Sequence, residues 1–178
     1  MLTPEDRSRL AAIAREAVRD AATGQDSPRP GHLSPALEAP GAAFVTLRKE
    51  GELRGCIGNL EASQSVWSSV QRMARAAAAE DDRFGPVSVE EVPFLELEIS
   101  VLGPRRPISR SSEVEIGRDG LYVLTPTHSG LLLPQVAPEH GWDAPTFLGQ
   151  ACRKAGLPAD AWKTGAVQLF AFSAEVFS

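Results

Sequence analysis

Apolar positions along the chain follow helical spacing in some stretches and strand spacing in others. The sequence Thr3-Pro4-Glu5-Asp6 is typical of a helix start, and the apolar stripe that follows it ends at Gly24. After a connection rich in Pro, Gly and Ser, residues 43–47 and 53–57 have the pattern of strands. A turn centred on Gly51 separates these two strands, so the spacing predicts a hairpin.

The elements after this hairpin are a long helix, a short helical turn and a strand with one polar face. They cover residues 66 to about 80, 88–91 and 94–102, and Ser63 or Ser65 can cap the long helix. The second half repeats the order, with a hairpin, a long helix, a short helix and a strand at residues 121–133, 143–156, 158–162 and 167–177. We therefore expect an α+β fold with a mainly antiparallel sheet and an internal duplication of the hairpin-helix-helix-strand unit. It would form a single domain over residues 1–178 that could consist of two lobes, about 1–105 and 106–178.

Composition and charge narrow the function classes. The chain has 178 residues and is 43% hydrophobic, and its 23 acidic and 18 basic side chains give a net charge of −5. This charge argues against a non-specific nucleic-acid binder. Two cysteines cannot form a disulfide framework, and no apolar run approaches the roughly 20 residues that span a bilayer. We expect a cytoplasmic protein with reduced thiols and no membrane segment.

The most concentrated candidate chemistry is the segment Leu53-Arg54-Gly55-Cys56-Ile57-Gly58-Asn59. Alternation on a strand would place Arg54 and Cys56 on one face, and a guanidinium beside a thiol favours the reactive thiolate. Cys56 is thus a candidate nucleophile, and Arg54 would tune it or bind an anion. Gly55, Ile57 and Gly58 would contact the ligand, since glycine permits close approach. The residues leave open that Cys56 is a small buried side chain and that the glycines serve a bulge.

An acidic turn follows the predicted long helix. Asp81 and Arg83 could contribute polar groups to the Cys56 site, or they could form a structural ion pair anchored by Phe84.

Gln135 and Glu139 are the candidates from the second half. In the predicted duplication, residues 54–58 and 133–136 occupy equivalent places, and a pseudo-twofold axis would bring Arg54 and Cys56 together with Gln135. The turn at residues 81–83 would lie nearby, giving one cleft for a small polar substrate. Alternatively, Gln135 only satisfies backbone groups at the end of a strand.

Metal and RNA sites have weaker support. The chain has no His pair at i, i+4 and no Cys-x-x-Cys, so we expect no metal site. Residues 55–58 match the loose Gly-x-x-Gly pattern that clamps RNA in one domain type, with a single basic neighbour, Arg54, directly before it. An RNA-binding regulatory domain is therefore a third alternative.

Several segments together resemble the AMMECR domain family, whose prokaryotic members are often called AmmeMemoRadiSam system protein A. The resemblance extends from about Pro4 to Phe177. It rests on Leu53-Arg54-Gly55-Cys56-Ile57-Gly58, Asp81-Asp82-Arg83-Phe84-Gly85-Pro86, Leu131-Leu132-Leu133-Pro134-Gln135-Val136-Ala137, Gly141-Trp142-Asp143, Phe147-Leu148 and Lys154-Ala155-Gly156-Leu157. Asp82 departs from the family pattern, which has a proline there, and this affects only the local turn.

The resemblance implies a fold and an association with other proteins, and it implies no reaction or cofactor. The segment around Cys56 is the signature of the family, which strengthens the interpretation of Cys56 as a functional residue. The system name implies partners that are Memo-like and radical-SAM proteins. The leading hypothesis is a cytosolic enzyme or enzyme subunit with a cysteine-centred cleft, and the alternative is a non-catalytic protein-binding adaptor.

Overall fold

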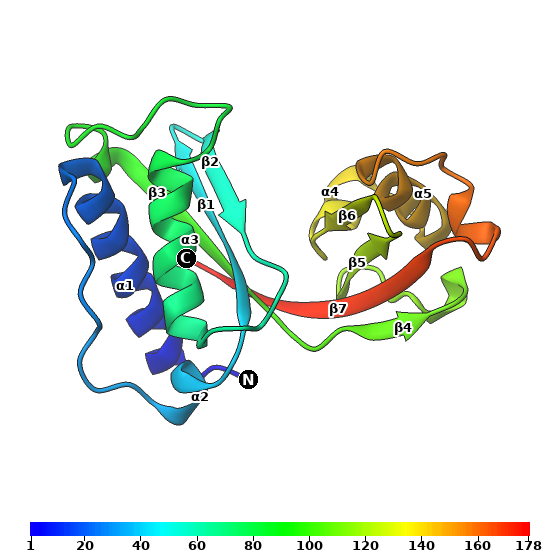
Figure 1. Ribbon diagram of the computed structural model, residues 1–178, viewed down its shortest axis with the longest axis horizontal. Coiled ribbons are helices and arrows are strands. Elements are labelled where there is room, and N and C mark those ends of the chain that lie inside the picture. The colour runs from blue at the N-terminus through cyan, green and yellow to red at the C-terminus, as the bar shows by residue number, and fades with distance from the viewer. The chain divides into compact units, whose positions relative to one another are not determined.

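The computed structural model describes all 178 residues, and the chain divides into two compact units. Unit 1 comprises Met1–Leu102 and Glu175–Ser178, and unit 2 comprises Gly103–Ala174. Each unit combines helices with antiparallel strands (Figure 1), so the predicted α+β class is confirmed. No helix of the chain has both the length and the apolar character that crossing a membrane requires.

The sheet of unit 1 has three strands in the order β2-β1-β3. They are β1 (Ala42–Lys49), β2 (Glu52–Gly58) and β3 (Leu95–Leu102), and both pairings are antiparallel. Glu50 and Gly51 form the predicted turn between β1 and β2, both with positive φ, which suits the twist of a two-residue hairpin. A bulge interrupts the pairing of β1 with β2 between Leu47 and Arg48.

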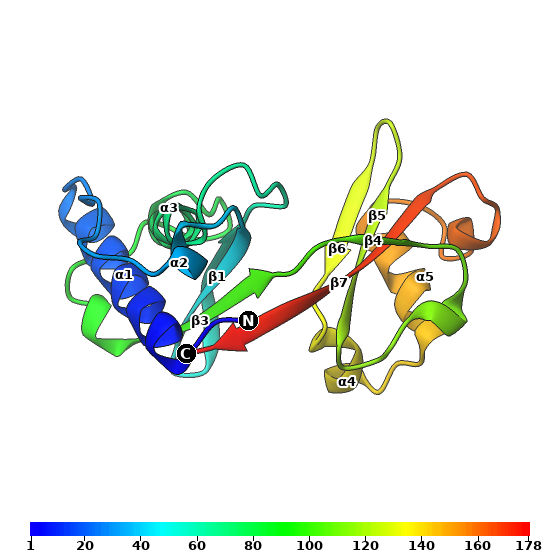
Figure 2. The ribbon, with the colours of Figure 1, turned by 90° about the horizontal axis from the view of Figure 1, so that it is seen from below.

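Helices cover one face of this sheet, which we call the inner face. They are α1 (Pro4–Thr23) and α3 (Val66–Ala79), and both lie on the same side of β1 and β3 (Figures 1 and 2). Thr3 and Asp6 cap the start of α1 reciprocally. The short helix α2 (Pro35–Glu38) and the 3₁₀ turn η1 (Val92–Phe94) complete the unit. The sheet contributes fully buried side chains to the core, among them Val45, Leu47 and Ile99.

Unit 2 has a four-stranded antiparallel sheet in the order β6-β5-β7-β4. Its strands are β4 (Arg106–Ile108), β5 (Asp119–Leu124), β6 (Ser129–Leu132) and β7 (Gln168–Phe177), the last residues of which belong to unit 1. Helix α5 (Ala144–Lys154) packs on β5 and β6 (Figure 2). The remaining elements are α4 (Val136–His140), η2 (Ser111–Glu113) and η3 (Ala161–Lys163).

Both units repeat one plan, in which a third strand runs antiparallel beside the first strand of a hairpin. In each unit the second strand of the hairpin also has a glycine that lies against a helix. Gly55 is opposite Leu47, and Gly130 is opposite Val123. A Cβ at Gly55 would lie 2.2 Å from the carbonyl oxygen of Ala77 in α3, and a Cβ at Gly130 would lie 2.9 Å from that of Ala151 in α5. Only glycine permits such close approach of a helix backbone to a strand.

The expected equivalence of residues 54–58 with residues 133–136 stays a prediction. Residues 54–58 lie within β2, whereas residue 133 directly follows β6 and α4 begins at Val136.

The short helices also differ from the prediction. The turn expected at residues 88–91 forms, since the N–H of Glu91 donates to the carbonyl oxygen of Ser88, but it is followed by an unpredicted 3₁₀ turn at Val92–Phe94 that contains Pro93. The helix expected at residues 158–162 is a 3₁₀ turn at Ala161–Lys163. Helix α4 was not predicted, and Gln135 lies at its N-cap position and not at a strand end.

Candidate functional site

Cys56 lies on the outer face of the unit 1 sheet, which is the face opposite α1 and α3. It pairs with Thr46, whose neighbours Val45 and Leu47 point into the core. The Cys56 side chain is partly exposed, and the hydroxyl of the buried Thr46 donates a hydrogen bond to Sγ over 3.2 Å. The thiol is therefore held in one position on the strand.

A contact between an aromatic ring and a glycine lies beside Cys56 on this face. The ring of Phe44 covers Gly58, because a Cβ built at Gly58 would lie 2.2 Å from two atoms of that ring. Phe44 and Gly58 are directly opposite each other in the pairing of β1 with β2. Gly58 thus permits close approach, as expected, and the group that approaches it is the Phe44 side chain.

The free edge of β2 is closed by the acidic turn. The backbone N–H of Cys56 donates to Asp81 Oδ2 over 2.8 Å, and Arg83 Nη2 donates to the carbonyl oxygen of Cys56 over 3.3 Å. Arg83 also holds Asp81 through two parallel bonds, Nε to Oδ1 at 2.9 Å and Nη2 to Oδ2 at 2.7 Å. Side chains therefore bind both backbone groups that Cys56 would otherwise offer to another strand.

The hydrogen bonds between Asp81 and Arg83 shift the pKa values of both side chains. The hydrogen bonds from the Arg83 guanidinium hold the pKa of Asp81 well below its usual range, although burial of the carboxylate opposes the effect. The Asp81 carboxylate in turn raises the pKa of Arg83. Both interpretations of the acidic turn thus describe part of the geometry, since the ion pair forms and its carboxylate contacts the main chain of Cys56.

Arg54 is bound to a second carboxylate. Its Nε and Nη2 donate to the two carboxylate oxygens of Glu91 at 3.0 and 3.1 Å, and it also donates to the carbonyl oxygens of Gly85 and Pro86. Lys49 approaches the same carboxylate at 3.2 Å. Hydrogen bonding to Arg54, more than any other contact, lowers the pKa of Glu91 to about 2. Arg54 therefore anchors the loop that follows α3 to β2.

The position of Arg54 differs from the expectation because of the bulge. Arg48 pairs with Leu53 and Leu47 pairs with Gly55, so Arg54 is the extra residue of β2. Strict alternation does not hold across an extra residue. The guanidinium that hydrogen-bonds to Cys56 belongs to Arg83, through the carbonyl oxygen, and the sequence did not single out that contact.

Thr46 and Glu91 were missed at the sequence level. Thr46 could have been found, since a hairpin centred on Gly51 pairs residues near 46 with residues near 56. Glu91 has no such signal, because 37 residues separate it from Arg54.

The structure brings together Arg54, Cys56, Asp81 and Arg83 within unit 1, along with Gly55, Ile57 and Gly58 of β2. Ile57 packs against the core of this unit. Gln135 and Glu139 belong to unit 2, at the start of α4 and on its exposed surface. Their convergence with Cys56 stays a prediction.

The two thiols have different surroundings. Cys152 in α5 is fully buried, and burial raises its pKa. Three or more His, Cys, Asp or Glu side chains that could hold a metal ion are found together nowhere in the chain. His140 binds the carbonyl oxygen of Val136 through Nδ1 and stacks on Trp142. Of the two cysteines, Cys56 is the one that can meet a ligand.

Comparison with known proteins identifies the family of the chain. Residues 11–177 match the AMMECR1 family model. Protein NEQ441 of Nanoarchaeum equitans is 37% identical over 175 residues, which cover 94% of this chain and 97% of that protein. A protein of Methanothermobacter thermautotrophicus is 38% identical over 183 residues, covering 99% and 95%. The crystal structure of the uncharacterized protein PH0010 from Pyrococcus horikoshii is similar with a TM-score of 0.92 and 36% identity, covering 98% of this chain and 92% of that one. The chain therefore belongs to the AMMECR1 family.

Proposed function

We propose that this chain is an enzyme or an enzyme subunit whose Cys56 thiol contacts the substrate. The observation that carries the proposal is the way Cys56 is held. Its side chain is partly exposed, Thr46 binds its sulfur, and Asp81 and Arg83 bind its two backbone groups. A thiol fixed on a strand by several bonds is positioned for a ligand before the ligand arrives.

The chemistry of the site suits a small substrate with an electrophilic centre, since a thiolate is the nucleophile that cysteine supplies. The ring of Phe44 adds an apolar surface on the same face of the sheet. The resemblance to the AmmeMemoRadiSam system suggests a cytoplasmic pathway shared with Memo-like and radical-SAM proteins. We also propose Gln135 and Glu139 of unit 2 as substrate-binding residues.

A non-catalytic adaptor is the second candidate function, and one observation favours it. The charged side chains of the signature segments have structural partners, since Arg54 binds Glu91 and Arg83 binds Asp81. An adaptor needs only the surface that these bonds stabilise. The RNA-binding alternative loses support, because residues 55–58 lie within β2 and do not join two helices.

Covalent trapping distinguishes the two candidates. Wild-type chain, Cys56→Ser and Cys152→Ala would each be incubated with the small-molecule fraction of the native cells and then read by intact-mass spectrometry. We expect an added mass on the wild type and on Cys152→Ala that is absent from Cys56→Ser. Binding of Memo-like and radical-SAM proteins would be measured with the same three chains.

Two outcomes contradict the enzyme proposal. An identical added mass on Cys56→Ser would place the reactive group elsewhere. No added mass on any chain, together with unchanged partner binding by Cys56→Ser, would favour the adaptor.

A further inference from the structure

Unit 1 contains a pocket on the inner side of the sheet. It lies between α1 and the segment formed by η1 and the start of β3, and its volume is about 480 Å³. Leu97, which lines it, pairs with Leu47 of the inner face, whereas Cys56 lies on the outer face. The volume is within the range of pockets that hold small organic ligands.

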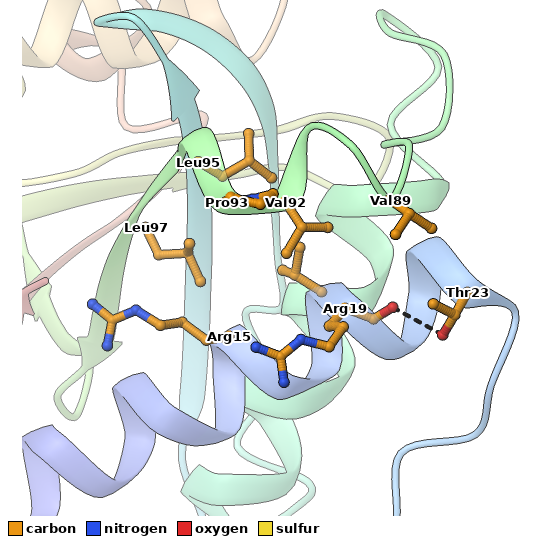
Figure 3. Close-up of a pocket in the computed structure, with 9 residues that line it drawn as sticks. Arg15, Arg19, Thr23, Val89, Val92, Pro93, Leu95 and Leu97 are labelled. Atoms are coloured by element: carbon orange, nitrogen blue, oxygen red, sulfur yellow. Dashed lines mark hydrogen bonds between the residues drawn. The ribbon is translucent and has the colours of Figure 1, made fainter.

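Most of the wall of this pocket is apolar. Figure 3 shows α1 along one side of the pocket and η1 with β3 along the other. The apolar lining consists of Val18, Val89, Val92, Pro93, Leu95 and Leu97. The side chain of Val89 is half exposed, at 49%, so the pocket opens to the surface past an apolar edge.

Two arginines line the α1 side. Arg15 and Arg19 are one helical turn apart and exposed, and Figure 3 shows both side chains leaving the same stretch of α1. Neither guanidinium has an ion-pair partner within the chain. Like charges four residues apart on a helix repel each other. The remaining polar lining group, the Thr23 hydroxyl, donates to carbonyl oxygens of α1.

The arginines at the other sites of unit 1 contrast with this pair. Four of them are neutralised by a carboxylate: Arg7 by Glu175, Arg29 by Glu38, Arg54 by Glu91 and Arg83 by Asp81. Arg15 and Arg19 thus present two uncompensated positive charges beside an apolar cavity. The charge and the apolar wall together define the ligand that complements them.

We infer that this pocket binds a small amphiphilic carboxylate, with its apolar tail in the cavity and its carboxylate between Arg15 and Arg19. A neutral apolar ligand would leave the two guanidiniums unpaired, and a free inorganic anion would leave the apolar wall in water. Guanidinium groups match the geometry of a carboxylate and bind it through paired hydrogen bonds. This binding site is independent of the thiol chemistry proposed for Cys56.

Binding of decanoate, decanol and acetate to the whole chain tests the inference. Each compound would be titrated below the concentration at which decanoate forms micelles, and methyl chemical shifts would be followed by NMR. We expect decanoate to shift the methyl signals of Val18, Val92 and Leu97 until saturation. Decanol should bind about tenfold more weakly, because it lacks the charge-assisted bonds, and acetate should cause no shift.

Matched variants distinguish binding of decanoate in this pocket from its non-specific attraction to basic side chains. The double variant Arg15→Gln/Arg19→Gln should bind decanoate about tenfold more weakly and lose the preference for decanoate over decanol. Arg9→Gln removes the same kind of charge from an exposed position of α1 outside the pocket and should leave the affinity unchanged. Val89→Asp introduces a negative charge at the exposed edge and should weaken decanoate binding. Thermal unfolding of each variant reports whether it folds.

Four results would overturn the inference. These are absence of saturable decanoate binding, equal affinity of the wild type for decanol and decanoate, equal losses in Arg9→Gln and in the double variant, and methyl shifts confined to residues outside the pocket.

Discussion

Replacing Gly55 with alanine should destabilise unit 1, because β2 and α3 are in backbone contact at this position. The new Cβ would lie 2.2 Å from the carbonyl oxygen of Ala77 and 3.2 Å from its carbonyl carbon. Cβ atoms essentially never come closer than 3.0 Å to another heavy atom, so strand and helix must separate by at least about 0.8 Å. A backbone carbonyl within a helix cannot rotate away as the end of a flexible side chain can.

The magnitude follows from two opposing effects. Overpacking a tightly packed core costs about 1–3 kcal/mol, and contact with helix backbone places Gly55→Ala at the upper end of that range. Alanine also lowers the conformational entropy of the unfolded chain, and this stabilises the folded state by about 0.4–1 kcal/mol. We expect a net loss of about 2 kcal/mol. For a chain of this size, such a loss lowers Tm by about 4–8 °C.

Urea unfolding, monitored by hydrogen exchange of peptides from β2 and α3, measures the loss in the free energy of unfolding of unit 1. Gly31→Ala is the control, since a Cβ at Gly31 would have nothing within 4 Å and its φ is not in the left-handed region. Gly130→Ala should have the corresponding effect on unit 2. If Gly55→Ala and Gly31→Ala unfold at the same urea concentration, β2 and α3 are farther apart than described and the reasoning fails.

Three further predictions concern the surroundings of Cys56. Glu91→Gln should be less stable than the wild type by about 1 kcal/mol at neutral pH, because the ion pair with Arg54 is lost. A double-mutant cycle with Arg54→Gln measures this contribution. Because the folded pKa of Glu91 is lowered to about 2 from 4.5, its stabilisation is complete above about pH 5 and is lost as pH falls towards 2, so the wild type and Glu91→Gln should converge in acid urea titrations. Asp81→Asn should be less stable than the wild type with the same sign of pH dependence, since the folded pKa of Asp81 is also lowered, and a constant difference down to the acid limit would refute this. A neutral maleimide should label Cys56 in the folded chain and Cys152 only after unfolding, as read by peptide mass spectrometry, and equal rates in the folded chain would contradict the burial of Cys152.

Local spacing was sufficient to predict the main elements of both units. The hairpin centred on Gly51 was predictable because a turn with positive φ is a property of a few neighbouring residues. Helices α3 and α5 were predictable because their buried residues recur with helical spacing. The short strand β4 has only three residues, Arg106–Ile108, and no periodic pattern can indicate so short an element.

The candidate site was only partly predictable, because its geometry depends on contacts between distant segments. The bulge that redirects Arg54 arises from the register of β2 against β1, and alternation along β2 alone cannot detect it. Asp81 reaches the backbone of Cys56 across 25 residues of sequence. The position of Cys56 itself followed from the strand pattern, since only its own segment and the hairpin were required.

The division of the chain has a consequence for how it folds. Glu175 closes unit 1 by binding Arg7, a residue 168 positions earlier, and closing so long a loop costs conformational entropy. Within unit 2, however, the N–H of Gly103 donates to the carbonyl oxygen of Ser173 over 2.8 Å. Once unit 2 has folded, the two chain segments that lead back to unit 1 are already joined, and the effective loop is much shorter. Folding of unit 2 should therefore precede the final closure of unit 1, and a mutation that unfolds unit 2 should also release Glu175 from Arg7.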